Sequence, residues 1–458
     1  MDAVDRELVR GEVDLLLGEL ETERFRHVAG LEPEPALARL FRARPKAAHR
    51  ETVAALRAAE DEPLARVVAR LRADRAAAER EEAWRAADAL AAGQGPDGRI
   101  GLGDASLAIR RERARDRRAA LGRAVGEAFA GAAAAREAWA EERARARAEV
   151  GLLPDWDVVV EADALLNASD DAYADVLGWL ARREALSPRP AGDLDRADLL
   201  HLLALAPWEG LFPAGMLALA LRELADSLRL DLSRLRIDDA ARPAQWPGAH
   251  ALGARVSFRR QGGAADWESL LLASGAALAA AHGPPPHARD AAFGAAVGAL
   301  LASLLLDRRW AERRLGVDRS RADDLRRVLA LRRLFALRTS AAALRVATEV
   351  ARGTAGAAWR EAHRDALSQA TLAAWPDGLA GRDADADAHA AALRGAALAA
   401  RLARSLRDRF DEDWWRNPRA AEALGGMLAA GAVAPGTSPE GEAPRLREGA
   451  EALVQAME

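Results

Sequence analysis

The residues of this chain with the clearest potential for chemistry are a serine and a histidine in one apolar stretch, Ser274 and His282. A serine that is activated by a histidine is the nucleophile of many hydrolases. The sharp turn that presents such a serine has a glycine two residues before it, and that position here is Leu272. The sequence therefore disfavours a nucleophilic serine. We interpret His282 as the end of a helix, where its partial positive charge suits the helix dipole.

Two short motifs resemble ligand-binding loops but lack residues that those loops need. The segment DADADAH, residues 383–389, offers carboxylates, yet an EF-hand loop that began at Asp383 would need glycine at Ala388 and glutamate at Arg394. We interpret it as the acidic start of a helix. The segment GQGPDG, residues 93–98, matches a dinucleotide-binding pattern, but it follows a helical pattern and contains a proline. We interpret it as a turn before a short hairpin.

The charge of the chain does not indicate nucleic acid or a membrane as a partner. The formal net charge is −4, although 30% of the residues are charged. The basic stretch at residues 109–123 contains seven arginines but no aromatic residue. We therefore expect a solvated helix with ion pairs rather than a nucleic-acid contact. The tryptophans are scattered along the chain, and we expect them in the core.

Composition predicts a soluble, cytoplasmic protein. With 458 residues, half of them apolar, the chain can bury a large core. It has no cysteine, which excludes disulfides and thiolate metal sites. The N-terminal residues include acids throughout and lack the apolar centre of a signal peptide. The longest uncharged apolar run, Ala291–Leu306, is shorter than the roughly 18–20 residues that span a bilayer.

Helical periodicity dominates the chain. Apolar residues recur three and four positions apart almost everywhere and β-branched residues are scarce, so we predict a mainly α protein. Helical patterns cover residues 5–29, 35–59, 64–92, 105–150, 171–184, 196–205, 213–228, 266–281, 288–306, 321–352, 355–374, 388–410 and 418–430. Short strands are predicted at residues 98–102, 235–238 and 254–258. A segment rich in Gly, Pro and Glu, residues 432–444, predicts a linker before a short final helix.

The strand predicted at residues 254–258 and the helix that follows it carry a pattern known from one family. A Gly262-Gly263 pair joins them, and the helix then contains a characteristic set of residues: Asp266, Trp267, Leu270, Leu271, Gly275, Ala277 and Leu278. This arrangement resembles the start of the zinc-binding helix in the thimet oligopeptidase/oligoendopeptidase F family of zinc metallopeptidases, which are gluzincins. Other segments are similar to the family in order and composition: residues 195–213, 228–239, 308–316 and 406–431.

The resemblance implies a zinc site whose ligands are replaced in this chain. In the family, two histidines four residues apart bind zinc, and a glutamate beside the first activates the zinc-bound water. Leu272 and Ala276 stand at the histidine positions, and Ala273 stands at that glutamate. The third ligand, a glutamate of the next helix, corresponds to Gly294 or Ala295. We name Leu272, Ala273, Ala276 and Ala295 the vestigial zinc-site positions, and expect Leu272, Ala276 and Ala295 to form a dry contact between the two helices.

These replacements predict a catalytically inactive relative of the family, a pseudopeptidase with no zinc and no other cofactor. The family's substrate-binding tyrosines also have no counterpart in residues 384–393. The resemblance implies a two-lobed helical fold with a very small β element beside the former zinc helix. We expect an N-terminal helical lobe at residues 1–190, an inactive peptidase-like lobe at 191–431, and a linker with a short helix at 432–458.

The expected role is binding of a peptide or a protein, or service as a scaffold, with a residual cleft at Asp266, Trp267 and His282. No nucleic acid or membrane partner is expected, and the sequence does not predict the oligomeric state. Two alternatives remain open, an active hydrolase with a displaced site and a purely structural helical scaffold. A polar, open channel would favour binding, whereas a channel filled by Leu and Ala would favour the scaffold.

Overall fold

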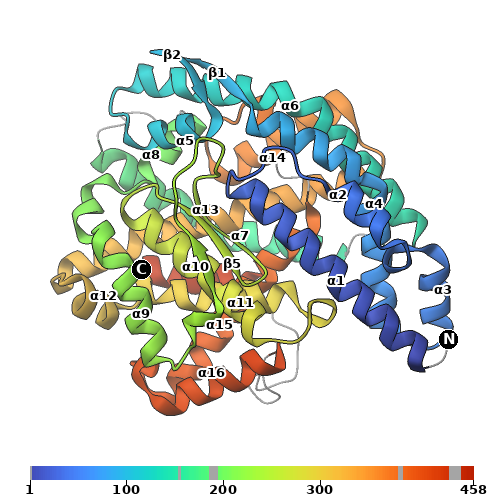
Figure 1. The fold of residues 1–458 in the computed structure, drawn as a ribbon. Coiled ribbons are helices and arrows are strands. Elements are labelled where there is room, and N and C mark those ends of the chain that lie inside the picture. Colours follow the sequence, from blue (N-terminus) through green and yellow to red (C-terminus); the bar gives the residue numbers. More distant parts are fainter. Residues whose placement is uncertain (1–2, 153–155, 185–193, 380–384, 433–444) are drawn as a thin grey trace.

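The computed structural model describes residues 3–152, 156–184, 194–379, 385–432 and 445–458. Helices make up most of it (Figure 1), which confirms the predicted mainly α fold. The α-helices are α1 (Ala3–Val28), α2 (Leu37–Ala43), α3 (Arg50–Ala58), α4 (Glu62–Ala89), α5 (Leu102–Arg111), α6 (Arg115–Glu149), α7 (Trp156–Arg183), α8 (Arg196–Leu202), α9 (Leu217–Ser227), α10 (Gly263–His282), α11 (Ala291–Ser303), α12 (Arg308–Leu315), α13 (Arg319–Ala351), α14 (Gly356–Thr371), α15 (Ala386–Phe410), α16 (Pro418–Ala430) and α17 (Arg447–Met457). The strands are β1 (Ala92–Gly95), β2 (Gly98–Gly101), β3 (Arg236–Asp238), β4 (Gly248–Leu252) and β5 (Arg255–Arg259).

Short polar side chains begin many of these helices. An oxygen at the position before the first turn accepts a hydrogen bond from a backbone N–H that has no partner within the helix, and each such cap stabilises by about 1 kcal/mol. Caps of this kind are made by Asp61, Asp195, Asp290, Asp307, Asp318, Asp385 and Asn417. Asp385 belongs to the acidic segment that the sequence placed at the start of a helix, and it caps α15. Residues 383 and 384 of that segment lie outside the described residues.

Several helices begin or end away from their predicted bounds. The pattern at residues 35–59 is divided into α2, a short 3₁₀ helix that starts at Pro45, and α3, because proline offers no N–H to continue a helix. The pattern at residues 105–150 is divided into α5 and α6. Helix α7 begins already at Trp156, where a run of valines gives a weak helical signal. Helix α12 and the strands β1 and β4 were not predicted.

The β structure is small and has two parts. Strands β1 and β2 form an antiparallel hairpin in which Gly95 pairs with Gly98. Residues 93–95 thus belong to the first strand of the hairpin, whereas the sequence placed the whole of residues 93–98 in a turn before it. The second sheet has the order β3-β5-β4, with β3 parallel and β4 antiparallel to β5. Strand β4 is therefore an edge strand of this sheet.

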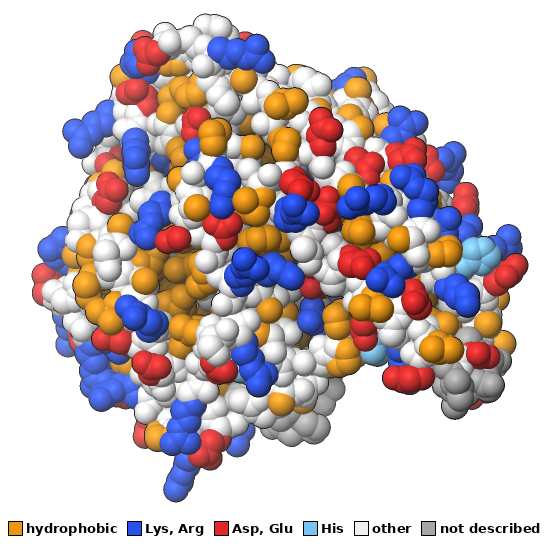
Figure 2. Space-filling model, viewed as in Figure 1, with side chains coloured by type: hydrophobic (Ala, Val, Ile, Leu, Met, Phe, Trp, Pro, Cys, Tyr) orange, Lys and Arg blue, Asp and Glu red, His pale blue; other side chains and the backbone are white. Residues whose placement is uncertain are grey.

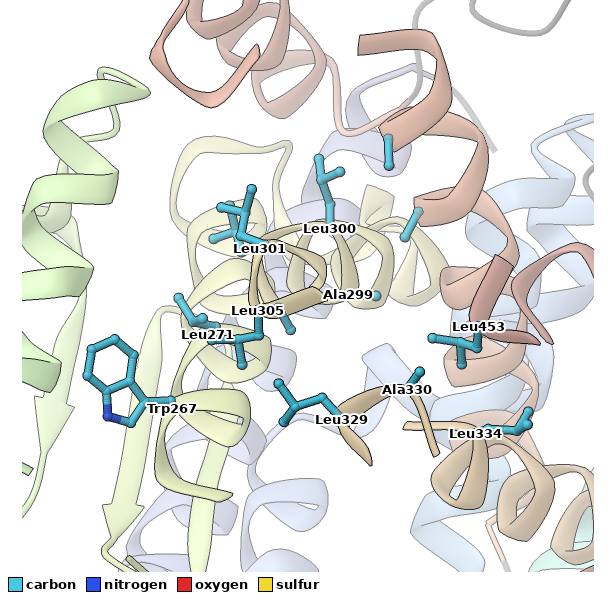
Figure 3. Close-up of a cluster of buried hydrophobic side chains, with 14 of the residues drawn as sticks. Trp267, Leu271, Ala299, Leu300, Leu301, Leu305, Leu329, Ala330, Leu334 and Leu453 are labelled. Carbon is cyan, nitrogen blue, oxygen red and sulfur yellow. The ribbon is translucent and has the colours of Figure 1, made fainter. Parts of the chain in front are cut away.

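The largest hydrophobic core surrounds α11. Helices α10 and α15 both pack against α11, and α10 also packs against β4. Figure 3 shows buried side chains of α10, α11, α13 and α17 in this core, among them Leu271, Leu300, Leu329 and Leu453. Helix α7 packs on α13 and α17 and contributes Leu177 to the same core. The core therefore joins helices from both halves of the chain.

Helices α1 to α4 and α6 form a separate layer on one side of the molecule (Figure 1). Buried ion pairs hold this layer together. Glu81 of α4 accepts hydrogen bonds from Arg24 Nη2 at 2.9 Å and Arg85 Nε at 2.8 Å. Arg143 of α6 donates to Asp74 of α4 at 2.9 Å and to Asp385 at 3.1 Å, which connects the layer to the start of α15. The lobe boundary predicted at residue 190 and most of the linker predicted at residues 432–444 lie outside the described residues.

The surface mixes charges of both signs. On the face seen in Figure 2, arginines and acidic side chains alternate. Among the described residues, no single helix is both long and apolar enough to cross a membrane. Two bent pairs reach that length and hydropathy only when their members are taken together, Arg196–Leu211 with Ala214–Ser227 and Ala291–Leu306 with Arg308–Leu315.

Candidate functional site

A cavity of about 870 Å³ lies beside α10. Its wall is built by α10, α11, α13, α15 and α17, with strand β4 at one side. All four vestigial zinc-site positions, Leu272, Ala273, Ala276 and Ala295, line this cavity. The structure thus brings together residues that the sequence separates into two helices. A cavity of this size is within the range of ligand-binding sites in proteins.

A turn of two glycines sets the direction of α10. Gly262 and Gly263 have φ angles of +98° and +57°, a region that residues with a side chain rarely adopt. A Cβ atom at Gly262 would also lie 2.8 Å from Nη2 of Arg111 and 3.0 Å from Oε1 of Glu209. The carboxylate of Asp266 accepts the backbone N–H of Gln261 at 2.5 Å, which closes the turn over the first turn of the helix. Burial raises the pKa of Asp266 above its ordinary value.

Helices α10 and α11 touch through glycine, and this explains why the vestigial positions do not form the predicted dry contact. A Cβ atom at Gly275 would lie 2.5 Å from the Cα of Gly298, and one at Gly298 would lie 2.3 Å from the carbonyl oxygen of Leu272. The backbones therefore meet directly along the Gly275 face. Leu272, Ala276 and Ala295 are partly exposed on the cavity side of this contact instead of filling it. Their small size leaves the space open.

The cavity also contains charged residues that sequence reasoning missed. Glu268 of α10 is 6% exposed and forms an ion pair with Arg332 of α13. Arg332 donates in addition to the carbonyl oxygen of Leu203 at 2.6 Å. The neighbouring Arg333 donates to the carbonyl oxygen of Ala299 at 3.0 Å, and burial lowers its pKa. The sequence contained one signal for Glu268, because it is the last acid before a long apolar stretch.

A second, half-buried acid follows the short 3₁₀ helix Leu304–Leu306 after α11. Asp307 lines the cavity and caps α12 by accepting the backbone N–H of Trp310 at 2.8 Å. Burial raises the pKa of Asp307, while the nearby Arg407 acts in the opposite direction. Ser303 and Ser340 are further polar residues of the wall. The wall is thus mainly apolar over α10, α11 and the alanines of α15, and most of its charged residues come from α13 and from Arg404 and Arg407 of α15.

The residues predicted to keep a residual cleft lie outside the wall of this cavity. Trp267 is 3% exposed and packs edge-on against Phe212 and Trp310, with ring centroids 5.9 and 6.2 Å apart. Asp266 closes the turn described above. The Nε2 of His282 lies 3.2 Å from the carbonyl oxygen of Asp231, at the end of α10. These side chains therefore hold α10 in place, and the cavity lies on another face of this helix.

The donor atoms of a zinc site are not present at the vestigial positions. Leucine and alanine side chains have no atom that can bind a metal ion. Within the described ranges, no three His, Cys, Asp or Glu side chains are grouped so as to hold a metal. The residues present therefore do not fit the zinc ion that the resemblance implies.

The basic stretch at residues 109–123 is part of the internal ion-pair network. Arg118 is fully buried, and its Nε donates to Asp198 of α8 at 2.9 Å. Arg115 forms a second ion pair with the same carboxylate, at 3.0 Å. Arg117 pairs with Asp97 and Glu112. The predicted ion pairs are therefore present, but the stretch is divided between α5 and α6, and Arg118 is buried rather than solvated.

Comparison with known proteins supports the fold. No family model and no curated protein matches the chain. Among solved structures, the chain is similar to an oligoendopeptidase F at 14% identity and a TM-score of 0.55, over 99% of this chain and 83% of that one. It is similar to the M32 carboxypeptidase from Deinococcus radiodurans R1 at 14% identity and a TM-score of 0.50, over 99% and 95%. A peptidase from Chlamydophila abortus gives 13% identity and a TM-score of 0.51, over 92% and 76%.

Identities this low carry no activity from one protein to another. What they establish is architecture, because each alignment covers nearly the whole of this chain. The chain therefore has the helical, two-lobed fold of these solved structures.

Proposed function

We propose that this protein is a pseudopeptidase that binds peptides in the cavity beside α10 without cleaving them. The observation that carries the proposal is the convergence of Leu272, Ala273, Ala276 and Ala295 on one cavity of about 870 Å³. By the resemblance of α10, these positions correspond to two histidines and two glutamates of a zinc site. Zinc chemistry needs those donors to hold the metal and to activate water. We therefore expect a site that still binds peptides but does not hydrolyse them.

The replacements are physically consistent with a site that no longer needs a metal. A buried group of histidines and glutamates without zinc would leave polar atoms unpaired, at a cost of several kcal/mol. Leu272 and the three alanines avoid this cost. They also leave the cavity open, since Ala276 and Ala295 are too small to fill it. An open cavity favours binding over the alternative of a filled, purely structural scaffold.

The edge strand favours a peptide as the bound molecule. Three consecutive residues of β4, Ala249, His250 and Ala251, line the cavity, and within the sheet β4 pairs only with β5. An extended peptide binds well to such an edge, because its backbone hydrogen bonds continue the sheet while its side chains occupy the adjoining space. The cavity next to β4 offers that space.

Three measurements on the purified protein test the proposal. Elemental analysis is expected to find no stoichiometric zinc, and quenched fluorescent oligopeptides are expected to remain uncleaved. Fluorescence anisotropy with the same peptides is expected to detect binding. Stoichiometric zinc with chelator-sensitive cleavage would refute the pseudopeptidase, whereas cleavage that a chelator does not affect would favour the alternative of a displaced hydrolase site.

A variant that fills the cavity tests where peptides bind. Ala276→Trp places a large side chain into the cavity and is expected to abolish peptide binding. Ala430→Trp is the matched control, because Ala430 is exposed at the end of α16 and does not line the cavity. Both variants should be checked by thermal melting. Equal binding by a folded Ala276→Trp protein and the parent would refute this location.

A further inference from the structure

The cavity wall carries an excess of positive charge. Six arginines line it, Arg110, Arg326, Arg332, Arg333, Arg404 and Arg407, against two carboxylates, those of Glu268 and Asp307. This corresponds to a formal excess of four positive charges in a chain whose overall net charge is −4. The excess is therefore local and opposite in sign to the whole molecule. Five of these arginines come from two helices, α13 and α15.

Part of this charge is compensated within the protein. Glu268 is engaged by Arg332, and its other oxygen lies 4.0 Å from Nε of Arg333. Both guanidinium groups also donate to backbone carbonyls, of Leu203 and Ala299. Burial nevertheless lowers the pKa of Arg333, because one carboxylate between two cations does not replace the lost hydration.

Three arginines of the wall lack a carboxylate in direct contact, although Arg407 acts on Asp307, and Arg404 on Glu448, through longer-range electrostatics. Within the described parts of the chain, Arg326, Arg404 and Arg407 form no hydrogen bond through their side chains and no ion pair within 4 Å, and the Nε of Arg326 is buried without a partner. Arg401, one turn before Arg404 on α15, shows the contrast. It makes two hydrogen bonds to Glu448, at 2.7 and 2.6 Å. Arg404, on the cavity, therefore lacks the hydrogen-bonded carboxylate that Arg401 has.

The spacing of these arginines places them along the cavity. Arg326 and Arg333 are seven residues apart on α13, so they share one face about 10 Å apart along the axis. Arg404 and Arg407 are three residues apart on α15 and also share a face. On the apolar part of the wall stand Leu272, Ala276 and Ala295. The site combines an apolar surface with several separated guanidinium groups.

We propose that the ligand is an acidic peptide, whose carboxylates pair with Arg326, Arg404 and Arg407 while its apolar side chains pack on the alanine-rich wall. The inference rests on the proposed function, since it names the class of peptide that the cavity binds. Several separated cations match several carboxylates along one chain, and β4 offers a backbone edge beside them. A single-headed amphiphile such as a fatty acid would use only one of these cations.

The test compares two labelled peptide pools by fluorescence anisotropy with the full-length protein. Both pools contain random short sequences with acetylated and amidated ends, one of Ala, Leu and Glu, the other with Gln in place of Glu. We expect the Glu pool to bind about tenfold more tightly, and added NaCl to reduce this preference. Arg404→Gln/Arg407→Gln, which changes two exposed side chains, is expected to remove most of the preference, and Arg326→Met part of it.

Matched controls and competitors separate the outcomes. Arg409→Gln/Arg419→Gln removes two exposed arginines that do not line the cavity and is expected to leave the preference unchanged. Equal binding of both pools, or a preference that survives in Arg404→Gln/Arg407→Gln, would refute the acidic peptide while the proposed peptide binding stands. If neither pool binds, the proposed function fails as well. Binding of sodium dodecanoate in the absence of peptide binding would overturn both and assign the cavity to a lipid-like anion.

Discussion

Two charged regions of this protein, the N-terminal helical layer and the cavity beside α10, differ in whether their arginines contact carboxylates. In the N-terminal layer, Glu81 is buried between Arg24 and Arg85, so carboxylate and cations compensate one another. In the cavity beside α10, Arg326, Arg404 and Arg407 have no carboxylate within 4 Å in the described residues. The carboxylate of Glu81 thus compensates its arginines within the protein, whereas the exposed Arg404 and Arg407 and the half-buried Arg326 are available to the anionic ligand that we propose. The difference separates charge that serves stability from charge that serves binding.

The largest effect is expected from breaking the ion pairs of the N-terminal layer. Glu81→Gln should reduce the free energy of unfolding by about 3 kcal/mol, because it leaves the partly buried Arg24 and Arg85 without the carboxylate that accepts their hydrogen bonds. Urea unfolding measures this change. Glu79→Gln on the same helix is the matched control, since its side chain is 80% exposed, and it should shift stability by less than about 0.5 kcal/mol.

Low pH should reproduce, in the parent protein, part of the loss in the free energy of unfolding that Glu81→Gln causes. Burial favours the protonated form of Glu81, but Arg24 and Arg85 together lower its pKa to about 2. A carboxyl group whose pKa is lower in the folded state contributes stability above its unfolded value of 4.5, and the contribution is lost as the pH falls toward 2. In Glu81→Gln this part of the acid dependence should be missing. An unchanged pH profile in the variant would contradict the assigned charge on Glu81.

The second prediction restores polar groups to the vestigial zinc-site positions. The variant Leu272→His, Ala273→Glu, Ala276→His and Ala295→Glu should bind zinc measurably by calorimetry, because these positions converge on one cavity. Without metal it should be less stable than the parent by about 3 kcal/mol, since polar groups are left without partners. Turnover is expected to be very low, because the substrate-binding tyrosines of the resembled family are also absent.

A glutamine variant controls for polarity alone in this second experiment. Glutamine at the same four positions should also destabilise the protein, but zinc should not raise its melting temperature. If zinc leaves the melting temperature of the His and Glu variant unchanged too, the four positions do not form a ligand set. The resemblance at residue level would then be wrong, although the fold would remain.

The third prediction concerns the contact that keeps the cavity open. Gly298→Ala should cost about 2 kcal/mol, because the new Cβ atom would lie 2.3 Å from the backbone oxygen of Leu272 and would force α10 and α11 apart. Gly425→Ala is the matched control, since no atom lies within 4 Å of the added Cβ in α16. It should be neutral or stabilising by up to about 1 kcal/mol. Equal melting temperatures for the two variants would contradict the close glycine contact.

The sequence predicted the helices and the first turn of α10 because these depend on local spacing. Helical periodicity and the Gly262-Gly263 pair are visible within one segment of chain. The dry contact predicted for Leu272, Ala276 and Ala295 was wrong because it depends on neighbours from elsewhere. The cavity exists through the positions of α13, α15 and α17, which no local pattern encodes. The pair formed by Glu268 and Arg332 joins residues 64 positions apart, so residue types alone could not identify it.

The smallest expected change in stability comes from a comparison of two arginines one turn apart on α15. Arg401→Gln removes the hydrogen bonds to Glu448, whose side chain is 16% exposed, and should cost about 0.5–1 kcal/mol. The hydrogen bonds from Arg401 lower the pKa of Glu448, so this loss should be present above pH 4.5 and disappear as the pH falls below it. Arg404→Gln should change stability by less than about 0.5 kcal/mol, because the exposed Arg404 acts on Glu448 only through longer-range electrostatics and makes no hydrogen bond or ion pair within 4 Å in the described structure. The two single variants should therefore differ in urea unfolding at neutral pH and converge in acid, while only Arg404→Gln weakens the binding of the acidic peptide pool. A stability loss in Arg404→Gln as large as that in Arg401→Gln would mean that Arg404 already has a partner within the protein, and the distinction between the two regions would no longer hold.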